Sequence, residues 1–285
     1  MKQLLARIFR FIFGQKVYVE KVTKPYVIKV QQEGRFDGRV AIVTGGGGAI
    51  GRATACRLAL EGATVVICGR NKATLDAVVE EMKDARGKVV ACPTDIMKEA
   101  DVEALVSNTV ADFGKLDFFV NVAGGGARDK MASIDDQEMS VVDSVLNTNL
   151  GGTLMCCKYA AKQMKKQQHG RIITTSSTVG VRGLARYSEY AVAKSAIIAA
   201  TESLAMELGK YGITVNCVTP GIVQRGQIAD DNLENIKNTN WLHSYCTPED
   251  IASMTAYLLS DEAHFITGQN FIVDGGRSLG LKGTK

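Results

Sequence analysis

Short runs of aliphatic and β-branched residues alternate with longer segments of helical periodicity along most of this chain. Residues 74–84 and 101–113, for example, carry apolar side chains at the three- and four-residue spacing of one helix face. The apolar runs have the length and composition of buried strands. They cover residues 40–44, 64–68, 88–92, 116–121, 171–175, 213–218 and 271–273.

Strands that alternate with helices form βαβ units, because parallel strands need a long crossover connection. We therefore predict an α/β fold in which one doubly wound, parallel sheet carries helices on both faces. Ligands bind such a sheet beyond the carboxyl ends of its strands. No linker or repeat divides residues 37–285, so we predict that they form a single domain.

The first 36 residues differ from the rest in charge. Eight basic and two acidic side chains give residues 1–36 a net charge of +6, so residues 37–285 carry −2 of the chain's total of +4. Residues 3–13 place apolar side chains on one half of a helical wheel, with Arg7 and Arg10 opposite. We predict a basic amphipathic extension over residues 1–36. Three roles stay open: docking on a subunit, peripheral membrane contact through residues 1–13, and organelle targeting.

Composition narrows the class of protein. The 34 basic and 30 acidic residues are too balanced for a nucleic-acid binder. Seven scattered cysteines without a C-x-x-C pair indicate neither a disulfide framework nor a zinc site, and the three histidines lie far apart. We expect no metal and a reducing, cytoplasmic location.

A glycine-rich loop follows the first predicted strand. Residues 40–44 run into Gly45-Gly46-Gly47-Gly48-Ala49-Ile50-Gly51, and a helical stretch follows. Glycines let backbone amides approach a pyrophosphate, and the positive end of the next helix offsets the phosphate charge. The loop predicts a nucleotide-phosphate cradle. A tight turn in a parallel sheet is the alternative.

The second strand ends at Gly69-Arg70-Asn71, where a dinucleotide fold reads the adenosine ribose. A carboxylate there accepts hydrogen bonds from the ribose 2′-hydroxyl of NAD and repels a 2′-phosphate. This chain offers Arg70 instead, and its planar guanidinium suits a phosphate. We predict a preference for NADP, with NAD as the alternative.

Tyr190 and Lys194 stand four residues apart in a helical stretch, so their side chains share a face. A nearby ammonium favours the phenolate and makes a tyrosine a usable acid–base catalyst at neutral pH. Ser177 follows the strand at 171–175, and its hydroxyl is placed to bond a substrate carbonyl oxygen. Tyr187 has alanine four residues later, and we assign it no such role.

These motifs, in this order, resemble the short-chain dehydrogenase/reductase family from Gly38 to Gly276. The resemblance rests on Thr44-Gly45 to Gly51, Asp95, Asn121-Val122-Ala123-Gly124, Asn149, Ser177, Tyr190-x-x-x-Lys194, Pro220-Gly221 and Asp274-Gly275-Gly276. It implies a Rossmann-type catalytic domain at residues 37–285. It also implies hydride transfer between a nicotinamide and a carbonyl or secondary alcohol, with no metal required.

The resemblance implies roles residue by residue. Tyr190 is expected to be the acid/base and Ser177 to orient the substrate oxygen, while Lys194 binds the nicotinamide ribose and Asn149 holds a water that links Lys194 to solvent. The expected catalytic set is Asn149, Ser177, Tyr190 and Lys194. The expected cofactor contacts are Gly45, Gly48, Ile50, Gly51, Arg70, Asn71, Asp95, Ile96, Asn121, Ala123, Gly124, Tyr190, Lys194, Pro220, Gly221 and Val223.

The sequence indicates the class of substrate less specifically than it indicates the reaction. The predicted lid between Arg225 and Thr247 is rich in Asp and Asn, which favours a polar substrate such as a sugar or hydroxy acid. Resemblance to the 3-oxoacyl carrier-protein reductases is visible at residues 125–129, where Arg128 would meet an acidic partner. A non-catalytic nucleotide-sensing scaffold is the alternative from another class. We expect a small-molecule substrate and a homo-oligomer, either a homotetramer or a dimer.

Overall fold

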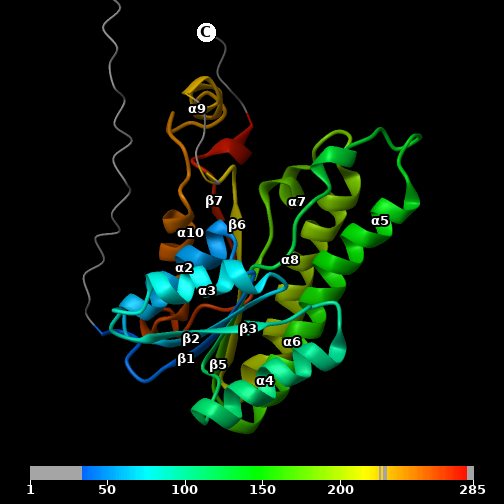
Figure 1. Cartoon of the computed structure of the whole chain (residues 1–285). Coiled ribbons are helices and arrows are strands. Elements are labelled where there is room, and N and C mark those ends of the chain that lie inside the picture. The colour runs from blue at the N-terminus through cyan, green and yellow to red at the C-terminus, as the bar shows by residue number, and fades with distance from the viewer. Residues whose placement is uncertain (1–33, 225, 227–229, 281–285) are drawn as a thin grey trace, which may run out of the picture.

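The computed structural model describes residues 34–224, 226 and 230–280, and the extension at residues 1–33 lies outside them. In the described part of the chain, seven parallel strands form one sheet in the order β3-β2-β1-β4-β5-β6-β7 (Figure 1). The strands are β1 (Val40–Thr44), β2 (Thr64–Gly69), β3 (Lys88–Pro93), β4 (Phe118–Asn121), β5 (Gly170–Thr175), β6 (Ile213–Pro220) and β7 (Asn270–Val273). The predicted doubly wound parallel sheet is confirmed.

Helices cover both faces of this sheet, as predicted (Figure 1). One face packs against α2 (Ala49–Leu60), α3 (Lys72–Glu81) and α10 (Pro248–Leu259), and the other against α4 (Glu99–Phe113), α6 (Gly152–Gln167) and α8 (Ser188–Leu208). Successive strand residues point to opposite faces. In β2, Val65 packs with the first group of helices and Val66 with the second. Both faces are therefore buried, which explains why the strands read as unbroken apolar runs.

Three shorter α-helices follow β4, β5 and β6: α5 (Met139–Leu146), α7 (Thr178–Arg182) and α9 (Asp230–Lys237). The predicted boundaries shift by a few residues at most. β4 begins at Phe118 rather than at residue 116, because the amide of Leu116 donates to Oε1 of Gln167 (3.0 Å) instead of to a neighbouring strand. A π-helical turn, Asn147–Gly151, lies between α5 and α6.

A buried carboxylate organises the opposite edge of the sheet. Asp117 is 3% exposed and accepts hydrogen bonds from the amide of Val40 (2.8 Å) and from Nη1 of Arg39 (3.4 Å). Nζ of Lys115 lies 3.1 Å from the same carboxylate. His169 borders the cluster, and burial lowers the pKa of its ring. Asp117 thus holds the start of β1 beside the start of β4.

We expect Asp117→Asn to destabilise the fold without touching the carboxyl edge. The neutral amide leaves the surrounding cations without a buried counter-charge, at a cost of about 1–3 kcal/mol. In a chain of this size that lowers Tm by about 2–4 °C per kcal/mol. Differential scanning calorimetry checks this against Asp112→Asn, a change at an exposed residue of α4. Equal Tm values for the two variants contradict this role of Asp117.

Candidate active site

Ser177, Tyr190 and Lys194 lie beyond the carboxyl edge of β5 and in the first turns of α8. Ser177 caps α7, and its Oγ accepts a hydrogen bond from the amide of Val179 (3.3 Å). Tyr190 and Lys194 stand one helical turn apart, and Nζ of Lys194 lies 5.7 Å from the centroid of the Tyr190 ring. The structure therefore confirms that the two side chains share a helix face.

The ammonium of Lys194 is held deep in the molecule. The residue is 4% exposed, and its Nζ donates to the carbonyl oxygen of Thr175 at the end of β5 (3.0 Å). Oγ of Ser176 donates to the backbone oxygen of Lys194 (2.6 Å). These two bonds fix the lysine between β5 and α8. A cation so little solvated acts strongly on any charge that develops nearby.

Asn149 is fully buried in the π-helical turn. Its Nδ2 donates to the carbonyl oxygens of Gly125 (2.8 Å) and Val145 (2.9 Å), and its Oδ1 accepts from the amide of Gly125 (3.0 Å). The side chain thus ties the loop after β4 to the helix pair α5 and α6. The expected water-holding role of Asn149 stays a prediction, and its two amide hydrogens are already used by the backbone.

The loop after β4 passes close to the predicted catalytic residues. A Cβ added to Gly124 would lie 2.5 Å from Oδ1 of Asn149 and 3.5 Å from Nζ of Lys194. Two residues later, a Cβ on Gly126 would lie 1.6 Å from the hydroxyl of Tyr187. Gly124 and Gly126 can approach these side chains only because neither has a Cβ.

The glycine loop forms the predicted turn between β1 and α2. Gly45 has a φ of +68°, and a Cβ on Gly51 would lie 2.2 Å from the carbonyl oxygen of Gly45. The amide of Gly48 donates to that same oxygen (2.9 Å) and closes the turn. Ile50 packs against the core and anchors the helix start. The loop therefore presents bare backbone at the amino end of α2.

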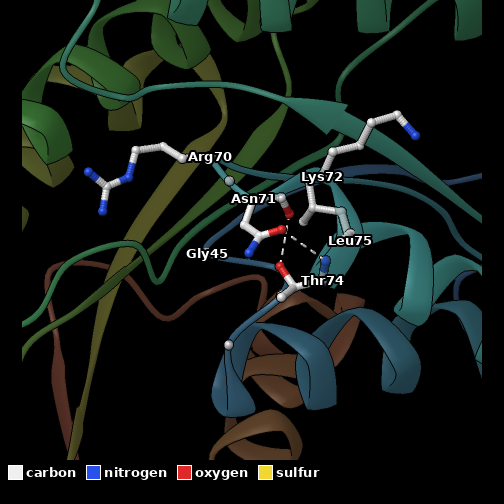
Figure 2. Close-up of a pocket in the computed structure, with 10 residues that line it drawn as sticks. Gly45, Arg70, Asn71, Lys72, Thr74 and Leu75 are labelled. Carbon is white, nitrogen blue, oxygen red and sulfur yellow. Dashed lines mark hydrogen bonds between the residues drawn. The ribbon is translucent and has the colours of Figure 1, made fainter.

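An open pocket of about 760 Å³ lies between this loop and the start of α3 (Figure 2). Its lining comprises Gly45, Gly47, Gly48 and residues 69–75. Asn71 caps α3, with its Oδ1 accepting from the amide of Thr74 (3.4 Å), and both residues line the pocket. The pocket combines a glycine loop, in which side chains would obstruct the approach of a phosphate, with a nearby arginine. This combination fits the phosphate-bearing adenosine end of a dinucleotide.

Arg70 and Lys72 differ in their partners at this pocket. Figure 2 shows their side chains extending in different directions from the loop. Lys72 forms an ion pair with Asp76 (2.6 Å), whereas no carboxylate in the described residues pairs with the exposed Arg70. Arg70 therefore leaves a positive charge available at the end of β2.

Three further predicted cofactor residues are held by bonds or packing within the protein. Oδ1 of Asp95 accepts from the amide of Met97 (3.1 Å), and Ile96 is buried against Gly152. Asn121 is 2% exposed; its Oδ1 accepts from Thr44 and its Nδ2 donates to Thr153. The Asn121 side chain thus joins β1 and β4 to α6.

Thr44, at the end of β1, positions the start of the next loop. Its hydroxyl donates to Oδ1 of Asn121 (3.0 Å) and accepts from the amides of Val122 (3.1 Å) and Ala123 (3.0 Å). Sequence reasoning included Thr44 in a motif but gave it no role. The sequence signal for this role was a threonine at the end of the strand, directly before the glycine loop.

The remaining predicted contacts follow β6. Pro220 ends this strand, and the amide of Gly221 donates to the carbonyl oxygen of Val273 (2.9 Å). A Cβ on Gly221 would lie 2.8 Å from Cβ of Asp274, so the turn packs directly against the end of β7. Val223 pairs with Cys246 in an isolated bridge, and Arg225 lies outside the described residues.

The structure thus gathers the predicted residues along one edge of the sheet. The glycine loop follows β1, Ser177 follows β5, Tyr190 lies in the first turn of α8, and Pro220 ends β6. Over the described ranges, no group of three or more His, Cys, Asp and Glu residues could hold a metal ion. Burial raises the pKa of the Cys56, Cys68 and Cys157 thiols to about 12, which keeps them protonated and unreactive.

Comparison with known proteins places this geometry in a family. A family model described as Enoyl-(Acyl carrier protein) reductase matches residues 47–278. Short-chain reductase protein NovJ of Streptomyces niveus is 38% identical over 84% of this chain and 93% of its own length. The chain belongs to the short-chain dehydrogenase/reductases. The resemblance drawn from the sequence motifs is therefore confirmed.

Other members of the family agree in length and fold. The 3-oxoacyl-[acyl-carrier-protein] reductase of Synechocystis sp. is 35% identical over 84% of this chain and 96% of its own. The crystal structure of NAD⁺-bound xylitol dehydrogenase superposes with a TM-score of 0.79 at 32% identity, covering 85% of this chain and 99% of the other. This short-chain dehydrogenase/reductase is an NAD(P)-dependent oxidoreductase that acts on carbonyl or alcohol groups.

The domain boundaries at residues 36 and 37, the role of each site residue, the oligomeric state and the cytoplasmic location stay predictions. In the part of the chain that the structure describes, no helix is long and apolar enough to cross a bilayer. The amphipathic segment at residues 1–13 lies outside the described residues, and its role stays open.

Proposed function

We propose that this enzyme interconverts a carbonyl and a secondary alcohol with Tyr190 as the acid/base. The observation that carries the proposal is the buried Lys194 ammonium one helical turn from the tyrosine, at the edge where parallel sheets bind ligands. The cation favours the phenolate, so the Tyr190 hydroxyl can give up and regain a proton at neutral pH.

Ser177 and Lys194 serve the same proton transfer from two sides. The Ser177 hydroxyl donates to the substrate oxygen and orients it, while Tyr190 protonates that oxygen in reduction or removes its proton in oxidation. A bound nicotinamide supplies or accepts the hydride. Gly45, Gly48 and Gly51 would lie against its pyrophosphate, and Lys194 would hold its ribose. The cofactor contacts predicted from the sequence are retained in this proposal.

We propose NADP as the preferred cofactor, with Arg70 binding the 2′-phosphate. The support is the Arg70 guanidinium beside the pocket at the end of β2, which no carboxylate of the described residues pairs with. A guanidinium bonds phosphate oxygens through a planar fork of donors, while a ribose hydroxyl gains less from it. Asn71 lies beside it but is committed to capping α3.

Arg70→Ala tests the cofactor preference. Loss of one exposed charge-assisted bond is expected to lower kcat/KM for NADPH by about tenfold and to leave the value for NADH nearly unchanged. Steady-state kinetics with both cofactors give the ratio. Lys83→Ala, which removes an exposed cation paired with Glu80 away from the pocket, is the control. An unchanged NADPH-to-NADH ratio in Arg70→Ala rejects the assignment.

We propose a polar substrate, a sugar or a hydroxy acid, from the Asp- and Asn-rich segment between residues 225 and 247. Reduction of a 3-oxoacyl carrier-protein substrate is the second candidate, favoured by the similarity to the Synechocystis reductase and by exposed Arg128 in the loop after β4. Oxidation of NADPH and NADH in the presence of sugar, keto-acid and 3-oxoacyl thioester panels separates the candidates. Failure with every carbonyl class supports the nucleotide-sensing scaffold instead.

We propose that the protein works in the cytoplasm as a homotetramer, with a dimer as the alternative. Analytical ultracentrifugation of the full chain distinguishes these states. The extension has three candidate roles, and co-sedimentation with anionic vesicles tests one of them. Full-length protein that pellets no more than a chain starting at Phe36 eliminates membrane contact through residues 1–13.

A further inference from the structure

A second tyrosine lies against the proposed acid/base. Tyr187 is only 3% exposed, and its ring stacks on that of Tyr190 with centroids 4.9 Å apart and planes inclined by 29°. The two residues stand one helical turn apart at the start of α8. One broad face of the Tyr190 ring is therefore covered by another aromatic ring, which restricts its tilt.

The backbone before α8 holds Tyr187 in this position. Arg186 adopts a φ of +65°, which is uncommon for a residue with a side chain, and its Nη2 donates to the carbonyl oxygen of Met131 (3.1 Å). The amide of Tyr187 donates to Leu184 (3.2 Å), and its carbonyl oxygen accepts from Ala191 (3.0 Å). The ring thus projects from a turn that is bonded on both sides.

The hydroxyl end of Tyr187 reaches the glycine segment after β4. A Cβ on Gly126 would lie 1.6 Å from the Tyr187 hydroxyl and 2.3 Å from Cζ of the ring. Of the two preceding glycines, Gly124 lies against Asn149 and Lys194, and the amide of Gly125 donates to Asn149. One short segment therefore contacts three side chains, and Tyr187 joins it to the Tyr190 ring.

We propose that Tyr187 is a positioning residue that sets the plane of the Tyr190 phenol relative to Lys194. The inference rests on the proposed role of Tyr190 as acid/base. Tyr187 acts through the ring that it stacks on and through the segment at residues 124–126, and it takes no part in proton transfer. The stacking contact with Tyr190 is made by the Tyr187 ring, so we expect a phenylalanine at this position to keep it.

The test compares Tyr187→Leu with Tyr187→Phe. A shift of the reacting group by about 1 Å can lower the rate about 10²-fold, so we expect Tyr187→Leu to lose about ten- to a hundredfold in kcat with little change in KM. Its pH–rate profile should move to higher pH, since the phenol sits less well against the ammonium. Tyr187→Phe should retain kcat and the profile. Equal kcat and an unchanged profile in Tyr187→Leu overturn the proposal.

Tyr159→Leu is the matched control. Tyr159 is also buried, at 8% exposure, but it lies in α6 and bonds Glu99. Its loss removes a buried ring without touching Tyr190, so kcat should hold at a temperature where both variants are folded. Titration with NADPH, followed by fluorescence, verifies that each variant binds cofactor. A loss of kcat in Tyr159→Leu equal to that in Tyr187→Leu overturns a specific role.

A double-mutant cycle with Gly126→Ala tests the route through the loop. Alone, this substitution forces the Tyr187 ring to move and should lower kcat. In a Tyr187→Leu background the ring is gone, so the added methyl should cost little, and the two effects should not add. Additive effects overturn the coupling. If Tyr190→Phe keeps full activity, the proposed function itself fails; if only Tyr187→Leu does, this inference alone fails.

Discussion

Tyr190→Phe lowers kcat by about 10²–10⁴-fold, the range over which a positioned acid/base contributes to catalysis. The phenylalanine keeps the ring that stacks on Tyr187 and removes only the hydroxyl that we propose exchanges a proton with the substrate oxygen. NADPH dissociation constants should stay close to the parent value, because Lys194 keeps its bond to Thr175. Steady-state kinetics and fluorescence titration measure the two quantities.

Tyr257→Phe is the control for this loss. Tyr257 is a partly exposed residue of α10, on the sheet face away from α8, and removing its hydroxyl should leave kcat unchanged. Activity of Tyr190→Phe within a few-fold of the parent contradicts the proposed mechanism, whatever the substrate. A large loss of NADPH affinity in Tyr190→Phe would point instead to a binding role for the hydroxyl.

Gly51→Ala is expected to disable the phosphate cradle. The new Cβ would lie 2.2 Å from the carbonyl oxygen of Gly45, and backbone cannot rotate away as a side chain does. Overpacking of this kind costs about 1–3 kcal/mol. If that cost falls on the cofactor-bound loop, the affinity for NADPH drops by about ten- to a hundredfold, since 1.4 kcal/mol is a factor of ten.

Gly209→Ala controls for the same change at an open position. Gly209 follows α8, and a Cβ there meets no atom within 4 Å. Isothermal titration calorimetry with NADPH compares both variants with the parent. Parent-like affinity in Gly51→Ala contradicts the claim that this loop carries the pyrophosphate, whereas weakened binding in both variants shows that the effect is not local.

The parts of the site that follow from spacing could be predicted from the sequence. Tyr190 and Lys194 share a face because any helix brings residues four apart together. The glycine loop is recognisable because a strand leads into it and a helix follows. Both depend on local geometry alone, and the structure reproduces both.

The parts of the site that depend on packing between elements could not be predicted from the sequence. We assigned Tyr187 no role because no lysine stands one turn beyond it, yet its stacking on Tyr190 is visible once α8 is built. The turn that aims its ring has a positive φ at Arg186, a residue type that gives no sign of it. Asn149 could be placed in a helical region, but its bonds to Gly125 arise from a loop 24 residues away.

Transfer of deuterium from the cofactor to the substrate tests whether this enzyme reduces a carbonyl by hydride transfer. The enzyme is incubated with NADPH that carries deuterium at both C4 positions of the nicotinamide and with a carbonyl found active in the panel. The product is analysed by mass spectrometry and NMR. We predict an alcohol that carries deuterium on the former carbonyl carbon, with a hydroxyl proton that comes from water through Tyr190. Deuterium on any other carbon, as in reduction of a C=C bond, or a product without deuterium, contradicts it.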